Sequence, residues 1–382
     1  MEYKLKELFD LQMGKTPSRN NSDYWNTKDN KWISIADLSK CEKYITDTKE
    51  YISDIAIKES GINPIPANTV VMSFKLSIGK TAITKEVIYS NEAIMSFRDK
   101  KTIELLPDYT YYLMMSKRWD EGTNKAVMGK TLNKATLSEI KVSVHDIAEQ
   151  QRIVNVLDKL TTLIDKRKKQ LKKLDELVKS RFVEMFGDPV ENPYSWEQTT
   201  LKNISIGKLS YGSGASACEY DGKTRYIRIT DIDSCGRLNE DVVSPSIIEE
   251  KYILNDGDIL FARSGATVGK SYRYRKSDGK CLYAGYLIRL IPNAELVLPD
   301  YVFYYTKTSY YERFIASNIK VVAQPNINAQ QYGDLTICIP PMELQKEFIA
   351  FVEQVDKSKF EIKQSLEKLE LLKKALMQKY FG

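Results

Sequence analysis

The sequence has few of the residues that metal sites and hydrolytic active sites need. It contains a single histidine, His145, and five scattered cysteines, none of which belongs to a Cys-x-x-Cys pair. Zinc sites need clusters of imidazole or thiolate ligands, and many hydrolases need a histidine base beside a nucleophile. The sequence therefore predicts no metal site and no catalytic residue in this chain.

Long apolar runs are also missing. No segment of the sequence approaches the roughly 18 consecutive apolar residues that a membrane-spanning helix requires. The start, Met1-Glu2-Tyr3-Lys4, lacks the basic and then apolar pattern of a signal peptide. Because the cysteines are odd in number and scattered, we expect a reduced, cytoplasmic protein with no membrane contact.

The chain has only a small excess of positive charge. The chain has 57 Lys and Arg against 51 Asp and Glu, a net charge of +6, which permits nucleic-acid binding without demonstrating it. Tyrosine is abundant, with 24 residues. Tyrosine rings suit polar interfaces, but they are equally common in ordinary cores, so this composition leaves both interpretations open.

Glycine and proline are absent from two long segments, 146–186 and 342–381. Asp146, with Glu149 three residues later, is typical of a helix N-terminus, and Gly187 is typical of a helix end. Each segment predicts a helix of about 40 residues, or about 60 Å at roughly 1.5 Å per residue.

Both predicted helices carry an apolar seam with heptad spacing. Basic residues interrupt each seam, and their stems can lie along it while the charges stay in water. Because a seam this narrow needs a partner, we expect the two helices to pair with each other, and the spacing alone does not choose between a parallel and an antiparallel pair. The predicted seam residues are Ile153, Leu157, Leu160, Ile164, Leu171, Leu174, Phe348, Val352, Val355, Ile362, Leu366 and Leu369.

The chain repeats itself. The segment 106–112 (Leu-Pro-Asp-Tyr-Thr-Tyr-Tyr) recurs at 298–304 as Leu-Pro-Asp-Tyr-Val-Phe-Tyr, and Met-Phe-Gly at 185–187 recurs as Tyr-Phe-Gly at 380–382. A repeat of this length indicates a duplicated domain and not a solenoid unit of roughly 20–50 residues. Segments that alternate apolar and polar residues also match between the halves, such as 32–38 with 226–232, and predict strands.

These patterns predict an α+β protein with two homologous mixed domains, each followed by one long helix. The expected boundaries are 1–145 for the first domain, 146–187 for the central helix, 188–340 for the second domain and 341–382 for the C-terminal helix.

A short segment invites a phosphate-binding loop interpretation. Residues 265–271 read Gly-Ala-Thr-Val-Gly-Lys-Ser, but the first glycine is one residue too close for the Gly-x-x-x-x-Gly-Lys-Ser pattern. The pattern therefore argues against nucleotide hydrolysis. Small residues beside Arg263 and Lys270 remain suited to a DNA phosphate, or to a solvated hairpin.

Three segments together resemble the specificity subunit of type I restriction–modification enzymes. Residues 146–154 (Asp-Ile-Ala-Glu-Gln-Gln-Arg-Ile-Val) begin a helix that ends in Phe-Gly-Asp-Pro, and 340–346 (Pro-Pro-Met-Glu-Leu-Gln-Lys) begin its repeat. The opening Met-Gly-Lys-Thr-Pro-Ser at 13–18 is similar to the start of target-recognition domains in that family. The second domain departs from this opening and reads Ile-Gly-Lys-Leu-Ser-Tyr-Gly at 206–212, so we do not expect the two domains to share a base preference.

The resemblance implies a non-catalytic subunit that binds a bipartite sequence in double-stranded DNA, one half-site per target-recognition domain. It implies that the two helices pair antiparallel, with pseudo-two-fold symmetry, and act as a ruler for the spacer. It also implies two methyltransferase subunits as partners and, through them, the restriction and translocase subunits. S-adenosylmethionine, ATP and Mg²⁺ would belong to those partners, and this chain would hold no cofactor.

Loop residues are the expected DNA contacts, because phosphate contacts position a protein and base-edge contacts specify the sequence. For phosphates we expect Lys75, Lys80, Lys130, Arg263, Lys270 and Lys320. For base edges we expect Arg19, Asn133, Arg228, Gln324 and Asn326, whose side chains can make paired hydrogen bonds. The alternative function is a coiled-coil scaffold that joins two protein-binding modules without nucleic acid, which the modest charge fits equally well.

Overall fold

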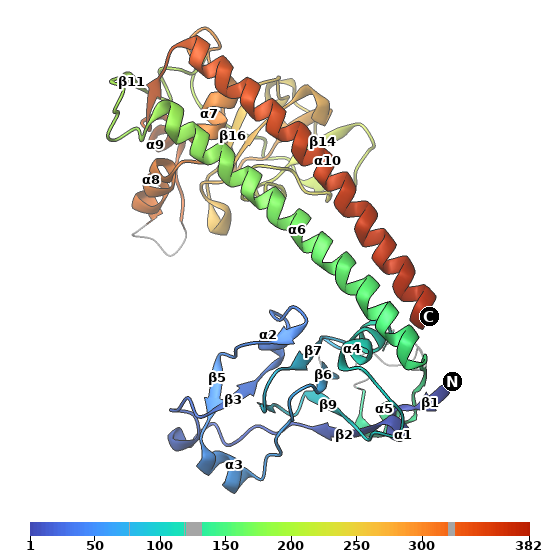
Figure 1. The fold of residues 1–382 in the computed structure, drawn as a ribbon. Helices are drawn as coiled ribbons and strands as arrows, with labels where there is room; N and C mark the ends of the chain where they lie inside the picture. The colour runs from blue at the N-terminus through green and yellow to red at the C-terminus, as the bar shows by residue number, and fades with distance from the viewer. Residues whose placement is uncertain (76, 118, 120–131, 320–324) are drawn as a thin grey trace. The chain divides into compact units, whose positions relative to one another are not determined.

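Two long helices link the parts of the fold in the computed structural model (Figure 1), which describes residues 1–382 except 76, 118, 120–131 and 320–324. The chain divides into two compact units, Met1–Arg167 with Ser365–Gly382, and Lys168–Gln364. The helices α6 (Ile147–Phe186) and α10 (Met342–Phe381) each have 40 residues and contribute to both units. Each unit therefore contains one domain, the first part of one helix and the last part of the other.

The first unit is built on a five-stranded sheet with the order β2-β9-β6-β7-β4, in which only the β4–β7 pair is parallel. A three-stranded sheet, β5-β3-β8, and the pair β1-β10 complete it. Its strands are β1 (Glu2–Lys4), β2 (Phe9–Met13), β3 (Asn30–Ile33), β4 (Tyr44–Ile45), β5 (Glu50–Ile52), β6 (Val70–Ser73), β7 (Thr81–Thr84), β8 (Tyr89–Ser90), β9 (Ile94–Asp99) and β10 (Lys141–Ser143). Its short helices are α1 (Leu5–Leu8), η1 (Ser22–Tyr24), α2 (Ile35–Leu38), α3 (Asp54–Ser60), α4 (Pro107–Ser116) and α5 (Lys134–Glu139).

The second unit repeats the centre of this plan with a four-stranded sheet, β12-β19-β16-β17, and with the pairs β11-β20, β13-β15 and β14-β18. Its strands are β11 (Glu197–Thr200), β12 (Ser210–Tyr211), β13 (Ala217–Cys218), β14 (Thr224–Ile227), β15 (Ser244–Pro245), β16 (Ile259–Ala262), β17 (Ser271–Arg273), β18 (Lys280–Tyr283), β19 (Leu287–Leu290) and β20 (Thr336–Ile339). Its helices are α7 (Pro299–Tyr305), α8 (Ser309–Ile319) and α9 (Ala329–Gly333), with 3₁₀ turns η2 (Ile229–Asp231), η3 (Glu250–Tyr252), η4 (Gly265–Thr267) and η5 (Lys276–Asp278).

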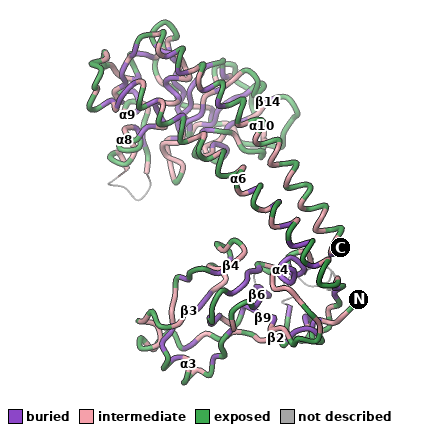
Figure 2. Tube along the Cα trace, in the orientation of Figure 1, coloured by how far each residue is buried: buried purple, intermediate pink, exposed green. Residues whose placement is uncertain are grey.

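The central strands match pair by pair. β6 lies between β9 and β7 in the first unit, and β16 lies between β19 and β17 in the second. Both central strands are buried along their length, as Figure 2 shows for β6. A strand that is covered on both faces must be apolar throughout, and Val70-Val71-Met72 and Ile259-Leu260-Phe261 are.

Helix α6 begins as the sequence predicts. The Asp146 carboxylate accepts a hydrogen bond from the Glu149 backbone amide (2.9 Å), which satisfies one of the free amides of the first turn. The Glu149 carboxylate does not complete a capping box but pairs with Arg152. At the other end Gly187 adopts a left-handed conformation (φ 76°) that glycine tolerates without strain.

The two long helices run antiparallel. In the second unit Phe182 of α6 packs against Phe348 near the start of α10, while Asp175, two turns earlier in α6, pairs with Lys359, further along α10. In the first unit the start of α6 and the end of α10 share one core, which includes Ile153 and Phe381. The α+β duplication and the antiparallel helix pair are therefore confirmed.

Burial of the seam residues falls along each helix. Ile153, Leu157, Leu160 and Ile164 of α6 and Phe348, Val352 and Val355 of α10 are buried, whereas Leu171, Leu174, Ile362, Leu366 and Leu369 are intermediate. Burial rises again at the end of each helix, where Phe182 and Phe186 of α6 are buried in the core of the second unit and Phe381 of α10 is buried in the core of the first. Across the described part of the chain, no helix has both the length and the apolar character that a membrane span would require.

Candidate nucleic-acid interface

The junction between domain and helix is built in the same way in both units. In the first unit the buried Gln150 side chain accepts a hydrogen bond from the Leu106 backbone amide (3.0 Å) and donates to the carbonyls of Glu104 and His145 (3.0 and 2.9 Å). In the second unit Gln345 makes the corresponding bonds to Leu298, Leu296 and Pro340 (2.8, 3.2 and 2.9 Å).

Aromatic side chains at the ends of the helices complete the junctions. Phe381, at the end of α10, packs against Tyr109 of the first unit with 5.3 Å between ring centroids. Phe186, at the end of α6, packs against Tyr301 of the second unit at 5.0 Å. Each domain is therefore fixed to the start of the helix that follows it and to the end of the other helix, which defines its orientation on the helix pair within that unit.

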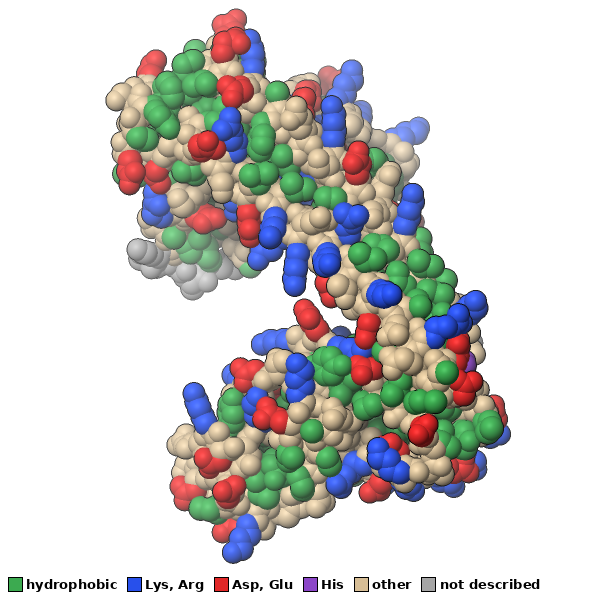
Figure 3. All heavy atoms as spheres, viewed as in Figure 1, with side chains coloured by type: hydrophobic (Ala, Val, Ile, Leu, Met, Phe, Trp, Pro, Cys, Tyr) green, Lys and Arg blue, Asp and Glu red, His purple; other side chains and the backbone are tan. Residues whose placement is uncertain are grey.

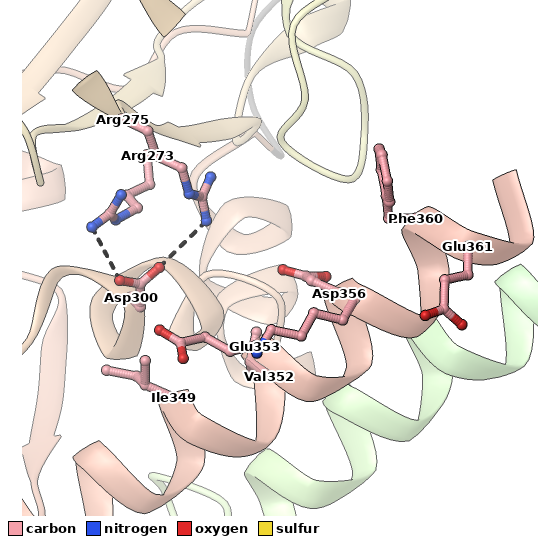
Figure 4. Close-up of a pocket in the computed structure, with 10 residues that line it drawn as sticks. Arg273, Arg275, Asp300, Ile349, Val352, Glu353, Asp356, Phe360 and Glu361 are labelled. Atoms are coloured by element: carbon pink, nitrogen blue, oxygen red, sulfur yellow. Dashed lines mark hydrogen bonds and ion pairs between the residues drawn. The ribbon is translucent and has the colours of Figure 1, made fainter. Parts of the chain in front are cut away.

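The aspartate of the repeated Leu-Pro-Asp-Tyr segment has basic partners in both units, and in the second unit it lines a pocket beside α10. Asp300 pairs with Arg273 and Arg275 (3.2 and 3.4 Å) opposite Glu353 and Asp356 of α10 (Figure 4). Burial raises the pKa of Asp300, and the two guanidinium groups only partly oppose it. Burial also acts on Asp108, but there hydrogen bonds from Lys43 and Tyr44 outweigh it and leave the pKa below its usual value. Each of the two aspartates has basic partners within the fold, which is typical of a structural contact and not of a reactive site.

The residues expected to contact phosphates have different surroundings. Lys80 is exposed and has no ion-pair partner among the residues that the structure describes, and Lys75 lies 5.5 Å from the Phe74 ring. The Lys270 ammonium donates to the Ile232 carbonyl (2.8 Å), so it already has a partner inside the domain. Lys130 and Lys320 lie outside the described residues.

Two of the arginine and asparagine side chains expected at base edges already have acidic partners. Arg19 forms a two-pronged ion pair with Glu50 and lies 3.8 Å from the Trp25 ring centroid. Arg228 pairs with Asp231 and Asp241 (2.7 and 2.8 Å).

Two further expected base contacts, Asn133 and Asn326, lie outside the helices and named strands. Asn133 caps α5, because its side chain accepts from the Thr136 amide (2.8 Å). Asn326 is exposed and forms a β-bridge with Ser264, beside the strand end that carries Arg263. Gln324 lies outside the described residues.

The opening of the second domain lies five residues later than the sequence comparison suggested. In the first domain the Gly14 amide donates to Ile94, and a Cβ there would be 2.1 Å from the Ser90 carbonyl oxygen. The residue with the same contacts in the second domain is Gly212, whose amide donates to Leu287 and whose Cβ would be 2.3 Å from the Ala284 oxygen. The glycine at 207, which sequence comparison placed opposite Gly14, has nothing within 4 Å of its Cβ position. Gly14 and Gly212 are therefore the equivalent residues, because both lie close against backbone carbonyl oxygens, although the sequence around them differs.

Backbone hydrogen bonds also define which residues correspond in the loops after the two central strands. The Arg263 amide donates to Tyr286 (3.1 Å) as the Phe74 amide donates to Ala93 (3.0 Å), so Arg263 occupies the place of Phe74 and not of Lys75. Gly269 and Gly79 likewise donate to the last residue of β16 and β6. As a result Lys270 corresponds to Lys80, and the two loops close in the same way.

The residues predicted from the sequence to contact DNA do not include the exposed lysines along the second part of α6. Lys169, Lys172, Lys173 and Lys179 are exposed there, and Figure 3 shows Lys and Arg side chains over this part of the helix. The signal in the sequence is the run 166–173, which contains six basic residues. Within the described residues, no three His, Cys, Asp or Glu side chains lie close enough together to hold a metal ion.

Comparison with known proteins adds a family. A family model described as the type I restriction modification DNA specificity domain matches residues 1–176 and 195–373. The chain is 24% identical over 404 residues to the type I restriction enzyme MjaIX specificity subunit of Methanocaldococcus jannaschii, covering 98% of this chain and 91% of that protein. It is 28% identical over 159 residues to the EcoR124I/EcoR124II specificity subunit of Escherichia coli, covering 39% of this chain and 38% of that protein.

Two solved structures share the fold. A chain from a study of complex assembly and conformational transition of the type I R-M system has a TM-score of 0.64 at 15% identity, covering 99% of this chain and 96% of that one. The crystal structure of a type I restriction-modification S subunit from M. genitalium has a TM-score of 0.55 at 15% identity, covering 100% of this chain and 96% of that one. At this identity the likeness concerns the fold alone.

Proposed function

Because the chain belongs to the family of the type I restriction modification DNA specificity domain, whose model matches both halves, we propose that it gives a type I restriction–modification complex its DNA sequence specificity. Each domain, 1–145 and 188–340, binds one half of a bipartite site in double-stranded DNA. The helix pair, 146–187 with 341–382, sets the spacer between the half-sites. A helix of about 60 Å corresponds to roughly 15–18 base pairs at about 3.4 Å each.

The observation that carries this proposal is the repeated junction. A bipartite DNA site has two similar halves, and a protein that reads it needs two domains held in equivalent ways on a rigid element. Gln150 and Gln345 fix the two domains to their helices through the same set of backbone groups. A protein scaffold would not need its two domains joined to their helices through the same contacts.

The chain itself is a non-catalytic subunit in this proposal, and it acts in the cytoplasm. Two methyltransferase subunits dock on it and bring S-adenosylmethionine, and the restriction and translocase subunits join through them with ATP and Mg²⁺. The loops after β6 and β16 contribute to the DNA surface, with Lys75, Lys80 and Lys270 near phosphates.

Methylation mapping in cells that carry the complete system tests the function. The variant replaces residues 188–340 with the second domain of a relative. We expect a two-part methylated motif in which only one half changes, because the first domain and the helices are intact. Exchange of residues 1–145 is the matched experiment and changes the other half.

A scaffold gives a different result. If the complete complex with the methyltransferase subunits does not shift random duplex DNA in a gel, and neither exchange alters methylation, the chain joins proteins and does not read DNA.

A further inference from the structure

Arg263 and two exposed tyrosines form a cluster at one end of the central sheet of the second domain. The guanidinium carbon of Arg263 lies 4.7 Å from the ring centroid of Tyr211, at the end of β12, and 6.0 Å from the ring centroid of Tyr286, just before β19. The tyrosines are 42% and 60% exposed. We refer to these three residues as the Arg263 cluster.

The first domain has the same backbone at this place but different side chains. Backbone hydrogen bonds make Gly14 equivalent to Gly212 and Phe74 equivalent to Arg263. By the same bonds, Met13 and Ala93 of the first domain occupy the places of Tyr211 and Tyr286. Phe74 is fully buried and Ala93 is nearly so. At this place the first domain has apolar side chains, of which Met13 is 44% exposed, and the second presents a cation beside two aromatic rings.

The Arg263 side chain differs from its neighbours in having no polar partner. Arg228, Arg273 and Arg289 of the same domain each pair with an aspartate. The Arg263 guanidinium forms neither an ion pair nor a hydrogen bond with any side chain or carbonyl in the described part of the chain, and its Nε atom is buried without a partner. The Nε atoms of Arg225, Arg273 and Arg289 are buried without a partner as well, so what distinguishes Arg263 is its two terminal nitrogens, which have no partner among the described residues and could donate to a ligand.

The two tyrosine rings preorganise the Arg263 guanidinium for a ligand. Stacking on rings restricts the plane of the arginine fork, so less conformational freedom is lost when it binds. The Tyr211 ring is itself fixed, because its hydroxyl accepts a hydrogen bond from the Ala329 amide at the start of α9 (3.1 Å). The cluster is therefore a preorganised, planar donor pair on the surface.

We propose that the Arg263 cluster reads a guanine in the half-site of the second domain, with the arginine donating to O6 and N7 of the base in the major groove. This inference rests on the proposed function. Guanine is the base that arginine recognises through two parallel hydrogen bonds.

A base contact fits better than the phosphate contact expected from the sequence. The phosphate backbone is the same at both half-sites, so a phosphate-binding position serves both domains with the same kind of residue. Lys80 and Lys270 satisfy that condition, since they occupy equivalent places in the two loops. Phe74 and Arg263 do not, and a difference at an equivalent position is what two unlike half-sites require.

The test uses the complete complex with Arg263→Gln and Arg263→Lys variants. The readouts are methylation mapping and binding to duplexes substituted one base pair at a time. We expect both variants to lose preference for guanine at one position of the second half-site, by roughly 5- to 150-fold in affinity, since a bidentate contact contributes about 1–3 kcal/mol. Lysine keeps the charge but lacks the fork, so Arg263→Lys separates base reading from simple attraction. The first half-site stays unchanged.

The matched control is Arg237→Gln in the same domain, where the arginine pairs with Asp233 (3.1 Å) and no change of motif is expected. Weaker binding to all sequences together with a shallower salt dependence would identify a phosphate contact and overturn the proposal. Unchanged discrimination at every position would overturn it as well. If the proposed function itself fails, the unsubstituted complex shows no bipartite motif at all, so the two failures are distinguishable.

Discussion

Gln150 and Gln345, 195 residues apart in the sequence, make the same three hydrogen bonds in two different units. Each amide oxygen accepts from the leucine that precedes a Pro-Asp-Tyr helix start, and each amide nitrogen donates to two backbone carbonyls. The glutamine that is part of the recognisable helix opening is therefore the residue that joins helix to domain. Its role is to satisfy backbone groups that the junction buries.

Replacement of either glutamine by alanine destabilises its own unit. Gln150→Ala leaves one amide and two carbonyls without their partner, and we expect a loss of about 2–4 kcal/mol in the free energy of unfolding. Urea denaturation followed by tyrosine and tryptophan fluorescence measures this loss. Gln151→Ala is the control, since that side chain is exposed and bonds to Asn155 within the same helix. Equal stability of the two variants would contradict the assignment.

The aromatic residue at the end of each long helix anchors the domain of the unit in which that end lies. Phe381→Ala removes a buried ring that packs on Tyr109, and we expect a cost of about 3–5 kcal/mol in the first unit. Phe186→Ala has the corresponding effect on the second unit. Hydrogen exchange of the strands β6 and β16 reports which unit is affected. Phe360→Ala is the control, because this ring is 61% exposed, and it leaves both strands protected.

Lys80 gives a prediction about salt dependence. If its exposed ammonium contacts a DNA phosphate, Lys80→Ala weakens binding to all sequences alike and lowers the slope of log affinity against log salt by about 0.9. Binding of the complete complex is measured between low and moderate salt. Lys4→Ala is the control, since that ammonium pairs with Glu139 (2.7 Å). We expect a smaller change from Lys270→Ala, because Lys270 donates to the Ile232 carbonyl. An unchanged slope in Lys80→Ala would remove this loop from the phosphate surface.

Lys307 makes stability depend on pH in the alkaline range. Burial lowers the pKa of its ammonium from 10.5 to about 8, against the opposing influence of Cys235 and Asp233. Between about pH 8 and 10.5 the unfolded chain binds more protons at this site than the folded one, so its contribution to stability rises with pH. Below about pH 8 the lysine is charged in both states, so burying its charged ammonium lowers the free energy of unfolding by the full amount.

The difference in unfolding free energy between the wild type and Lys307→Met isolates this contribution from other titrating groups. We expect the difference to shift in favour of the wild type as pH rises from 7.5 to 10. The exposed Lys208→Met serves as the control for the loss of a lysine charge. A flat difference for Lys307→Met would show that its ammonium titrates alike in both states.

Much of the architecture could be predicted because its signals are local or repeated. The absence of glycine and proline from two segments of 40 residues defines two long helices, and Asp146 and Gly187 mark the ends of one of them. The repeated Leu-Pro-Asp-Tyr segment reveals the duplication without any knowledge of contacts. The heptad seam indicates that the helices pair, since its apolar face needs a partner.

Individual DNA contacts could not be predicted in the same way. Arg19 and Arg228 look like free donors in the sequence, but folding brings Glu50 and Asp241 next to them. The equivalence of Gly14 with Gly212 depends on two carbonyl oxygens near each Cβ position, and residue spacing in the sequence does not record that. The Arg263 cluster joins residues from three separate strand ends, so no window of sequence contains it.

The sequence by itself determined the duplication, the two long helices and the residues that begin and end them, because helix periodicity and capping act over a few neighbouring residues. Only the tertiary structure decided which helix end holds which domain, which arginines pair with carboxylates, and that the Arg263 guanidinium has no polar partner among the described residues. Those outcomes depend on side chains that meet across the sheet and the helix pair, and their distances are set by packing and not by position along the chain.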